Sequence, residues 1–269
     1  MRHWITLTAI ALGAAIVSAD DIDTARPLMA SAMSELATYD RVTIDINGQE
    51  SYRGVDTPFR YSLAAQFLAA PVPTTHFEGM FSKNGVGNGR LAGDGQWLWH
   101  WDPVARTYSS SRYQTDSTVA ANQFADHRQR VLQAISKRVT GPASFGAHIL
   151  MESFGANASN LATLDSRWRP WLSTATVVVR SSPGMAEVEC TSTTPISARL
   201  TYYLEETATG GWALNSAVYQ SSVSVAGNLR VQEWTATVYR GTLPTDFSRT
   251  FSAPAGSRSV SIQGKQVGG

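Results

Sequence analysis

Apolar residues near the start of the chain recur every three or four positions, which is the spacing of one helical face. The segment from Ile22 to Tyr39 shows this pattern, and Pro27 lies in its early turns, where proline is tolerated. The residues on the apolar face are Ala25, Leu28, Met29, Ala32, Leu36 and Tyr39. The sequence therefore predicts an amphipathic helix here.

After this helix the apolar period changes to two, as in a strand with one buried face. The alternating residues are Val42, Ile44 and Ile46, then Phe59, Tyr61, Leu63, Ala65 and Phe67, then Phe77, Gly79 and Phe81, and finally Trp97, Trp99 and Trp101. Asn47-Gly48 is a strong turn signal, and residues 85–95 read as a turn-rich connection. Residues 42–113 are thus predicted to form an antiparallel meander with one aromatic face.

The helical period returns in residues 117–172, with a break at Gly141-Pro142 and shorter helical pieces at Phe145–Phe154 and Ala158–Leu172. Strands then fill the last hundred residues. They are predicted at Thr176–Arg180, Ala186–Thr191, Ile196–Glu205, Trp212–Val225 and Leu229–Arg240. Two blocks of strands around a helical insert predict one α+β domain over residues 20–269.

The first 19 residues have the three parts of a secretory signal peptide. Arg2 and His3 give a basic start, Ile5 to Val17 is apolar, and small residues lead to Ala19. We expect cleavage near Ala19/Asp20, with no lipid-attachment cysteine after the apolar run. No later segment reads as a membrane span, which needs about 20 apolar residues. The expected location is periplasmic or extracellular.

The composition of the 269-residue chain excludes several classes of protein. Lys and Arg number 22 against 21 Asp and Glu, and this balance argues against a nucleic-acid partner. The single cysteine, Cys190, excludes a disulfide framework and is expected to be a small buried side chain. We expect no cofactor, no metal and no catalytic residues, so the chain is not predicted to be an enzyme.

Two pairs of polar residues keep a metal-dependent secreted enzyme open as a minor alternative. His76 and Glu78 share one strand face, and His100 and Asp102 share another. Four such side chains could bind zinc if their strands were neighbours. Each pair, however, lies on the predicted polar side of its strand, where solvated residues belong.

The aromatic face is the most informative feature. Its candidate ligand-binding residues, expected to point the same way, are Phe59, Tyr61, Leu63, Phe67, Phe77, Phe81, Trp97, Trp99 and Trp101. One interpretation is an ordinary core covered by helices. The other is a cavity on a curved sheet that helices cover incompletely and an apolar ligand fills. Such a cavity suits acyl chains, which gain about 0.8 kcal/mol per buried methylene.

Three stretches of the chain resemble the LolA-like group of exported proteins, which includes lipoprotein carriers and the lipoprotein-sensing domain of RseB. An amphipathic helix leads into a strand that reads TYDRVTIDI. The stretch Ala92–Pro103 is similar to the family's glycine-to-Asp-Pro hairpin, and Phe247–Gly256 is similar to its closing strand. In layout the resemblance covers most of residues 20–260.

This resemblance implies an open, strongly curved antiparallel half-barrel with helices over its concave apolar face. It also implies binding of a lipid, acyl chain or lipoprotein without chemistry, and leaves room for envelope protein partners. The long helical insert departs from the family pattern. The arginine that family carriers place in the cavity has no matching position, and Arg60 and Arg90 are nearby candidates. The main alternative is an interaction or stress-sensing module that does not transport lipid.

Overall fold

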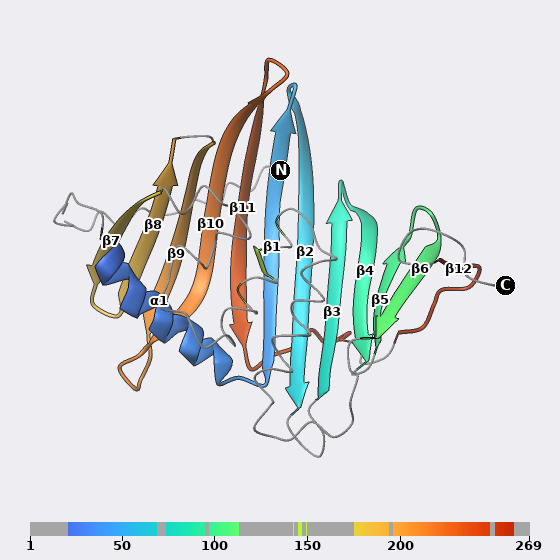
Figure 1. Ribbon diagram of the computed structural model, residues 1–269, viewed down its shortest axis with the longest axis horizontal. Helices are drawn as coiled ribbons and strands as arrows, with labels where there is room; N and C mark the ends of the chain where they lie inside the picture. Colours follow the sequence, from blue (N-terminus) through green and yellow to red (C-terminus); the bar gives the residue numbers. More distant parts are fainter. Residues whose placement is uncertain are drawn as a thin grey trace, which may run out of the picture.

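The computed structural model describes residues 21–68, 74–94, 97–112, 142, 145–146, 149, 175–193, 196–247 and 251–260. The strands of this part of the chain form one open, curved sheet (Figure 1). The strands are β1 (Arg41–Tyr52), β2 (Val55–Leu68), β3 (Thr74–Lys83), β4 (Val86–Asp94), β5 (Trp97–Asp102), β6 (Thr107–Arg112), β7 (Thr176–Ser182), β8 (Met185–Ser192), β9 (Ser197–Glu206), β10 (Trp212–Val225), β11 (Asn228–Arg240) and β12 (Arg258–Ser259).

The spatial order is β12-β6-β5-β4-β3-β2-β1-β11-β10-β9-β8-β7. Strands β1–β6 and β7–β11 each form an antiparallel meander. The antiparallel meander predicted for residues 42–113 is confirmed, apart from two of its predicted turns, and the five later strands are confirmed to within one or two residues. The two meanders are joined because β1 pairs with β11, in register from Val42↔Arg240 to Tyr52↔Arg230. The two predicted blocks of strands therefore make a single sheet.

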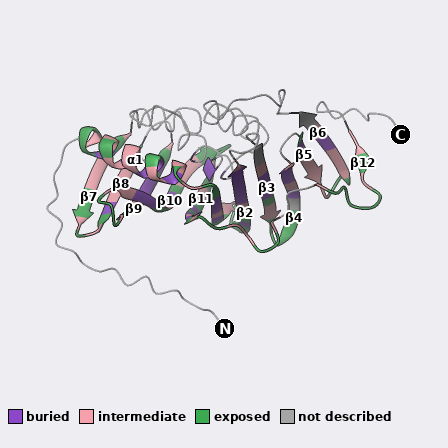
Figure 2. Ribbon diagram, turned by 90° about the horizontal axis from the view of Figure 1, so that it is seen from below, coloured by how far each residue is buried: buried purple, intermediate pink, exposed green. Residues whose placement is uncertain are grey.

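Helix α1 (Ile22–Ala37) packs across one face of this sheet, over β7 to β10 (Figures 1 and 2). Its buried residues are Ala25, Met29, Ala32, Met33 and Leu36, close to the predicted apolar face. We call the sheet face under α1 the covered face. Alternate strand residues on it, such as Ile44, Leu200 and Val188, are fully buried. Cys190 also lies on this face and is buried, as expected.

Asp21 secures the start of α1 to the edge of the sheet. Its backbone N–H donates to the Val177 carbonyl at 2.9 Å, and its carboxylate accepts from the Val179 N–H at 3.1 Å. These bonds satisfy backbone groups of β7, the last strand at that edge, which would otherwise be open to pairing with another chain.

Two turn predictions are wrong, for the same reason. β1 continues straight through Asn47-Gly48, and the turn comes at Arg53-Gly54, where both φ angles are positive. The stretch 86–94, predicted as a connection, is strand β4, paired on both sides. In both places neighbouring strands supply backbone hydrogen bonds, and this pairing outweighs the low strand propensity of glycine.

Four described residues of the predicted insert are helical and buried: Pro142, Phe145, Gly146 and Ile149. The Phe145 ring lies 4.8 Å from that of Trp234 and 6.2 Å from that of Tyr202, on the covered face. Gly146 lies so close to Leu63 that a side chain there would collide with it. A helical segment thus packs on the covered face at this point. The other residues predicted to be helical in 117–172 lie outside the described residues.

The expected α+β class is corrected by the structure. The described residues form a β-rich fold in which α1 is the single helix with defined bounds. The stretch predicted as a turn-rich connection forms β4, so the described part of the chain holds more strand than predicted. No helix within the described ranges is long and apolar enough to cross a membrane. The predicted signal peptide, residues 1–19, lies outside the described residues.

We predict that Gly48 is required by the packing of the sheet. A Cβ there would meet the Glu233 carbonyl oxygen and lie 2.5 Å from the Trp234 Cβ and 2.8 Å from the Phe59 ring. Gly48→Ala should therefore lower the free energy of unfolding by about 3 kcal/mol, measured by urea denaturation. Gly87→Ala, at a strand glycine with nothing within 4 Å of the added atom, is the control and should change it little. Equal effects of the two variants would contradict this account.

Candidate functional site

The strand register separates the nine candidate residues onto two faces of the sheet. Through β2 and β3, Tyr61 pairs with Phe81 and Leu63 with Gly79, so the phenylalanines, Tyr61 and Leu63 share the covered face. Between β4 and β5, however, Leu91 pairs with His100 and Gly93 with Leu98. Residues opposite each other project from the same face, so Leu98 and His100 lie on the covered face.

The three tryptophans therefore point away from the other six candidates, and the predicted common orientation is wrong for Trp97, Trp99 and Trp101. Leu98 takes the buried position and is 1% exposed, whereas Trp97 is 38% exposed. In strand β5 the tryptophans alternate with Leu98 and His100, so a period of two allows either set to face the core. A shift of one residue in register would move every side chain to the opposite face, and the pairing with β4 determines which set is buried.

The six candidates on the covered face belong to its core. Phe59, Leu63, Phe67 and Phe77 are buried, and Tyr61 is partly buried. The rings of Phe59, Tyr61 and Phe81 form a ladder with centroids 5.3 and 5.5 Å apart. Burial first, and the nearby Glu50 carboxylate second, raise the pKa of the Tyr61 hydroxyl above 10.0, so the phenol stays neutral at neutral pH.

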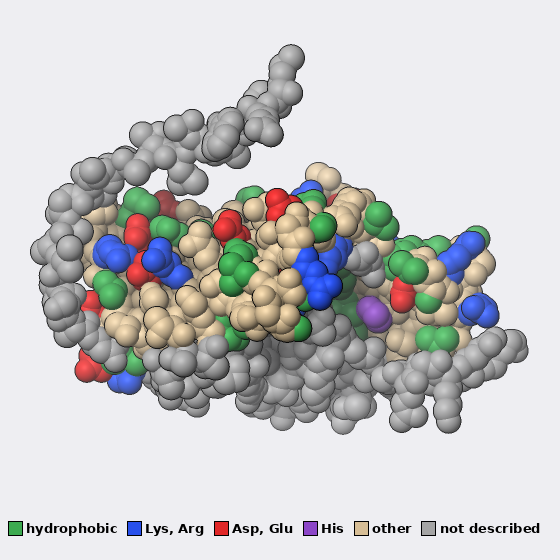
Figure 3. Space-filling view, turned by 90° about the horizontal axis from the view of Figure 1, so that it is seen from above, with side chains coloured by type: hydrophobic (Ala, Val, Ile, Leu, Met, Phe, Trp, Pro, Cys, Tyr) green, Lys and Arg blue, Asp and Glu red, His purple; other side chains and the backbone are tan. Residues whose placement is uncertain are grey.

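A charged rim bounds this ladder at the tips of the hairpins. Glu50 forms ion pairs with Arg230 and, at 3.8 Å, with Lys83. Figure 3 views the molecule from the side of these tips, and basic and acidic side chains lie intermixed along that rim.

The C-terminal segment crosses the opposite face of the sheet, and we call this segment, residues 241–247 and 251–260, the strap. It leaves β11 where the Gly241 N–H donates to the Arg41 carbonyl at 2.8 Å, and the Thr43 hydroxyl donates to the Thr242 carbonyl at 3.0 Å. It ends as β12, in parallel pairing with β6 (Figure 1). The sheet face beneath it is the strap face.

The tryptophans of β5 lie on this strap face. The Trp99 ring stacks on Phe251 of the strap, with centroids 5.5 Å apart and planes 17° apart. The Tyr108 ring also packs against this phenylalanine, with ring centroids 5.8 Å apart. The resemblance had placed Phe251 in a closing strand, but in the structure it anchors the strap on β5 and β6.

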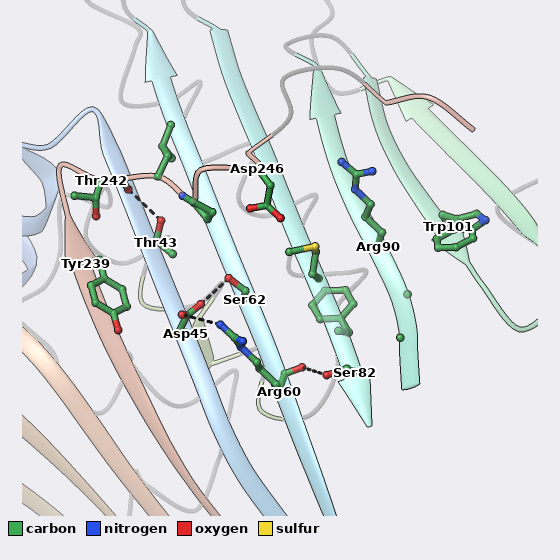
Figure 4. Close-up of a pocket in the computed structure, with 16 residues that line it drawn as sticks. Thr43, Asp45, Arg60, Ser62, Ser82, Arg90, Trp101, Tyr239, Thr242 and Asp246 are labelled. Carbon is green, nitrogen blue, oxygen red and sulfur yellow. Dashed lines mark hydrogen bonds and ion pairs between the residues drawn. The ribbon is translucent and has the colours of Figure 1, made fainter. Parts of the chain in front are cut away.

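A cavity of about 690 Å³ lies between the strap and strands β1 to β5 (Figure 4). This volume is within the range of about 300–1,000 Å³ typical of small-molecule sites. Its apolar wall combines residues of the sheet and of the strap: Met80, Phe81, Trp101, Tyr239, Leu243 and Pro244. Its polar residues are Thr43, Asp45, Arg60, Ser62, Ser82, Arg90, Thr242 and Asp246. Of the nine candidate ligand-binding residues, Trp101 and Phe81 line this cavity, and Phe81 lies at a register shift in β3.

Both arginines of the cavity are engaged with carboxylates of the same sheet face. Arg90 Nε donates to Glu78 Oε1 at 2.8 Å, and the Glu78 side chain is 6% exposed. Arg60 lies 3.4 Å from Asp45, which also accepts a 2.6 Å hydrogen bond from Ser62. Figure 4 shows this second group across β1 and β2.

The residues proposed for a metal enzyme do not converge. His76 and Glu78 lie on the strap face, whereas His100 lies on the covered face. The Asp102 carboxylate accepts hydrogen bonds from the Val104 and Ala105 N–H groups and so caps the β5–β6 turn. Within the described ranges, no three His, Cys, Asp or Glu side chains gather as a metal site would require.

Sequence reasoning missed most of the strap-face cavity. Its strand residues, such as Asp45, Ser62 and Met80, occupy the polar phase of β1 to β3, which the period-two pattern assigns to solvent. Two sequence features did point to this cavity. One is the pair of candidate arginines, Arg60 and Arg90, and the other is the C-terminal motif at Phe247–Gly256. Nothing local connects that stretch to these strands.

The burial of Glu78 makes a prediction about Arg90. Arg90→Met should lower the free energy of unfolding at pH 7 by about 3 kcal/mol, because it leaves a buried carboxylate without its arginine. Arg60→Met removes a pair whose arginine side chain is 63% exposed and should cost less than about 1 kcal/mol. Urea denaturation of both variants measures the difference, and a loss at Arg60 as large as that at Arg90 would contradict the assignment.

No family model and no curated protein matches the sequence. Among solved structures, the chain is similar to a DUF1329 family protein from Desulfovibrio piger, with 11% identity and a TM-score of 0.31, covering 86% of this chain and 96% of that one. It is also similar to chicken CD1-1, at 10% identity and a TM-score of 0.16 over 77% and 91% of the two chains. A third is MucB in complex with MucA(peri), at 8% identity and a TM-score of 0.14 over 81% and 100%. Similarities at these TM-scores do not establish a shared fold or a shared function.

Proposed function

We propose that this chain is an exported, non-enzymatic binding protein for a small amphipathic ligand. The observation that carries the proposal is the cavity between the strap and the sheet. It has the volume of a small-molecule site and walls from two parts of the chain that are far apart in sequence. The signal-peptide pattern of residues 1–19 supports export to the periplasm or the exterior.

The chemistry of the walls favours an amphipathic ligand over a purely apolar one. Met80, Leu243 and Pro244 offer apolar surface, and the Trp101 and Tyr239 rings add flat contact area. Hydroxyl and charged groups occupy the same cavity and can orient one polar end of a ligand. The charged groups of the sheet are held in ion pairs, which suits recognition better than proton transfer.

This proposal moves the ligand from the covered face to the strap face. The Phe59–Phe81 side of the sheet contributes to the core, and Phe145 and Gly146 pack on it. An acyl ligand there would have to displace packed side chains, whereas the strap-face cavity needs no such displacement. Binding at the covered aromatic residues is therefore kept as the competing site in the experiment below.

We predict that Leu243→Asp weakens binding of an uncharged apolar probe. N-phenylnaphthylamine fluoresces more strongly when it leaves water, so titration of the mature protein with it gives a Kd. Replacing a leucine of the cavity wall by a carboxylate removes about 1.5 kcal/mol or more of apolar contact, so Kd should rise about tenfold.

Leu229→Asp is the matched control, because Leu229 is 61% exposed in the β10–β11 hairpin, away from the cavity. Its Kd should equal that of the unaltered protein, and thermal melts should show both variants folded. If Tyr61→Ala weakens binding and Leu243→Asp does not, the ligand lies on the covered face and the strap-face site is wrong.

A further inference from the structure

We propose that the strap-face cavity selects a cationic amphiphile, a molecule with an apolar body and an ammonium group. This inference rests on the proposed binding function and specifies its ligand class. Two arginines in a cavity suggest, at first sight, an anionic ligand. The carboxylates around these arginines indicate instead that the ligand carries a positive charge.

Arg90 is not available to an anion. Its guanidinium pairs with Glu78, a carboxylate that is almost completely buried, and this buried ion pair would be lost if Arg90 turned toward a ligand. Both partners project from the strap face, on paired strands β3 and β4. The pair is therefore a fixed part of the cavity wall and is close to neutral.

Arg60 is also paired with a carboxylate, although its side chain is 63% exposed and the pair is weaker than that of Arg90. It pairs with Asp45, whose side chain is 19% exposed and whose other oxygen accepts a hydrogen bond from Ser62. The Arg60–Asp45 pair spans β1 and β2 at the base of the cavity (Figure 4). It adds a second nearly neutral group.

Asp246 is the charge that remains. It lines the cavity from the strap, is exposed to solvent, and forms no ion pair or hydrogen bond through its side chain with any described residue. If Glu78, the partner of Arg90, is included, three carboxylates contribute negative charge to the site and two guanidinium groups contribute positive charge. The carboxylates are those of Asp45, Glu78 and Asp246, and the guanidinium groups are those of Arg60 and Arg90. Figure 4 shows the Asp246 carboxylate on the strap without a dashed line to any neighbour. Among the described residues, the unbalanced charge of the site is therefore negative.

Aromatic side chains of the wall are compatible with the same ligand. Tyr239 and Trp101 line the cavity, and the faces of such rings attract ammonium groups. The apolar contacts of Met80, Leu243 and Pro244 supply the surface for the body of the ligand. A cationic amphiphile thus has a partner for each of its two parts.

The test compares three amphiphiles with the same alkyl chain, each below its micelle concentration. Dodecylammonium, dodecanoate and dodecyl maltoside are titrated against the mature protein loaded with N-phenylnaphthylamine, and displacement gives three affinities. We expect dodecylammonium to bind about fivefold more tightly than dodecyl maltoside, and dodecanoate to bind most weakly. Added salt should reduce the preference for the cation.

Asp246→Asn should remove the preference for dodecylammonium and leave the affinity for dodecyl maltoside unchanged. Asp56→Asn is the matched control, because Asp56 is also an exposed aspartate but does not line the cavity. It should keep the preference.

Each outcome separates the two proposals. If dodecyl maltoside displaces the probe but dodecylammonium shows no advantage, or if dodecanoate binds most tightly, the cationic ligand class is wrong and the binding function stands. If Asp246→Asn keeps the preference, the assigned carboxylate is wrong. If no amphiphile displaces the probe and the probe itself does not bind, both proposals fall.

Discussion

The pairing of β1 with β11 is the constraint on which the rest of the structure depends. These strands lie 198 residues apart at their Val42↔Arg240 end, and their ladder turns two separate meanders into one sheet. It aligns the buried residues of β1, such as Ile44 and Ile46, with Val238 and Ala236 of β11. One apolar face then continues from β7 to β5, and α1 and Phe145 can pack on it.

The same pairing fixes what happens on the other face. Because β11 ends beside the start of β1, the chain that leaves it begins next to Thr43 and crosses over β1 to β5. The stack of Trp99 on Phe251 and the pairing of β12 with β6 hold its far end. A polar sheet face that would otherwise be fully solvated thereby acquires a second wall and a cavity.

The electrostatics of that cavity follow from burial. Glu78 is nearly buried because the sheet and its neighbours surround it, and its charge is tolerated because Arg90 lies across the β3–β4 pair. Asp246, on the strap, meets no such partner among the described residues. The ligand that the site favours depends on which charged groups already form ion pairs within the protein, and not on the number of arginines.

The sequence by itself determined the helix near Ile22–Ala37, the strands of both meanders other than β4, and the residues of the aromatic ladder in β2 and β3, because these depend on local periodicity and propensity. It could not determine whether Gly48 turns or continues a strand, since the answer depends on the approach of Trp234 and Phe59 from neighbouring strands. It could not fix the face of Trp97 to Trp101, because a period of two has two phases and only the register with β4 selects one. The strap-face cavity was decided by tertiary structure alone: its walls come from strands at one end of the chain and a segment at the other, and the β1–β11 ladder brings them together.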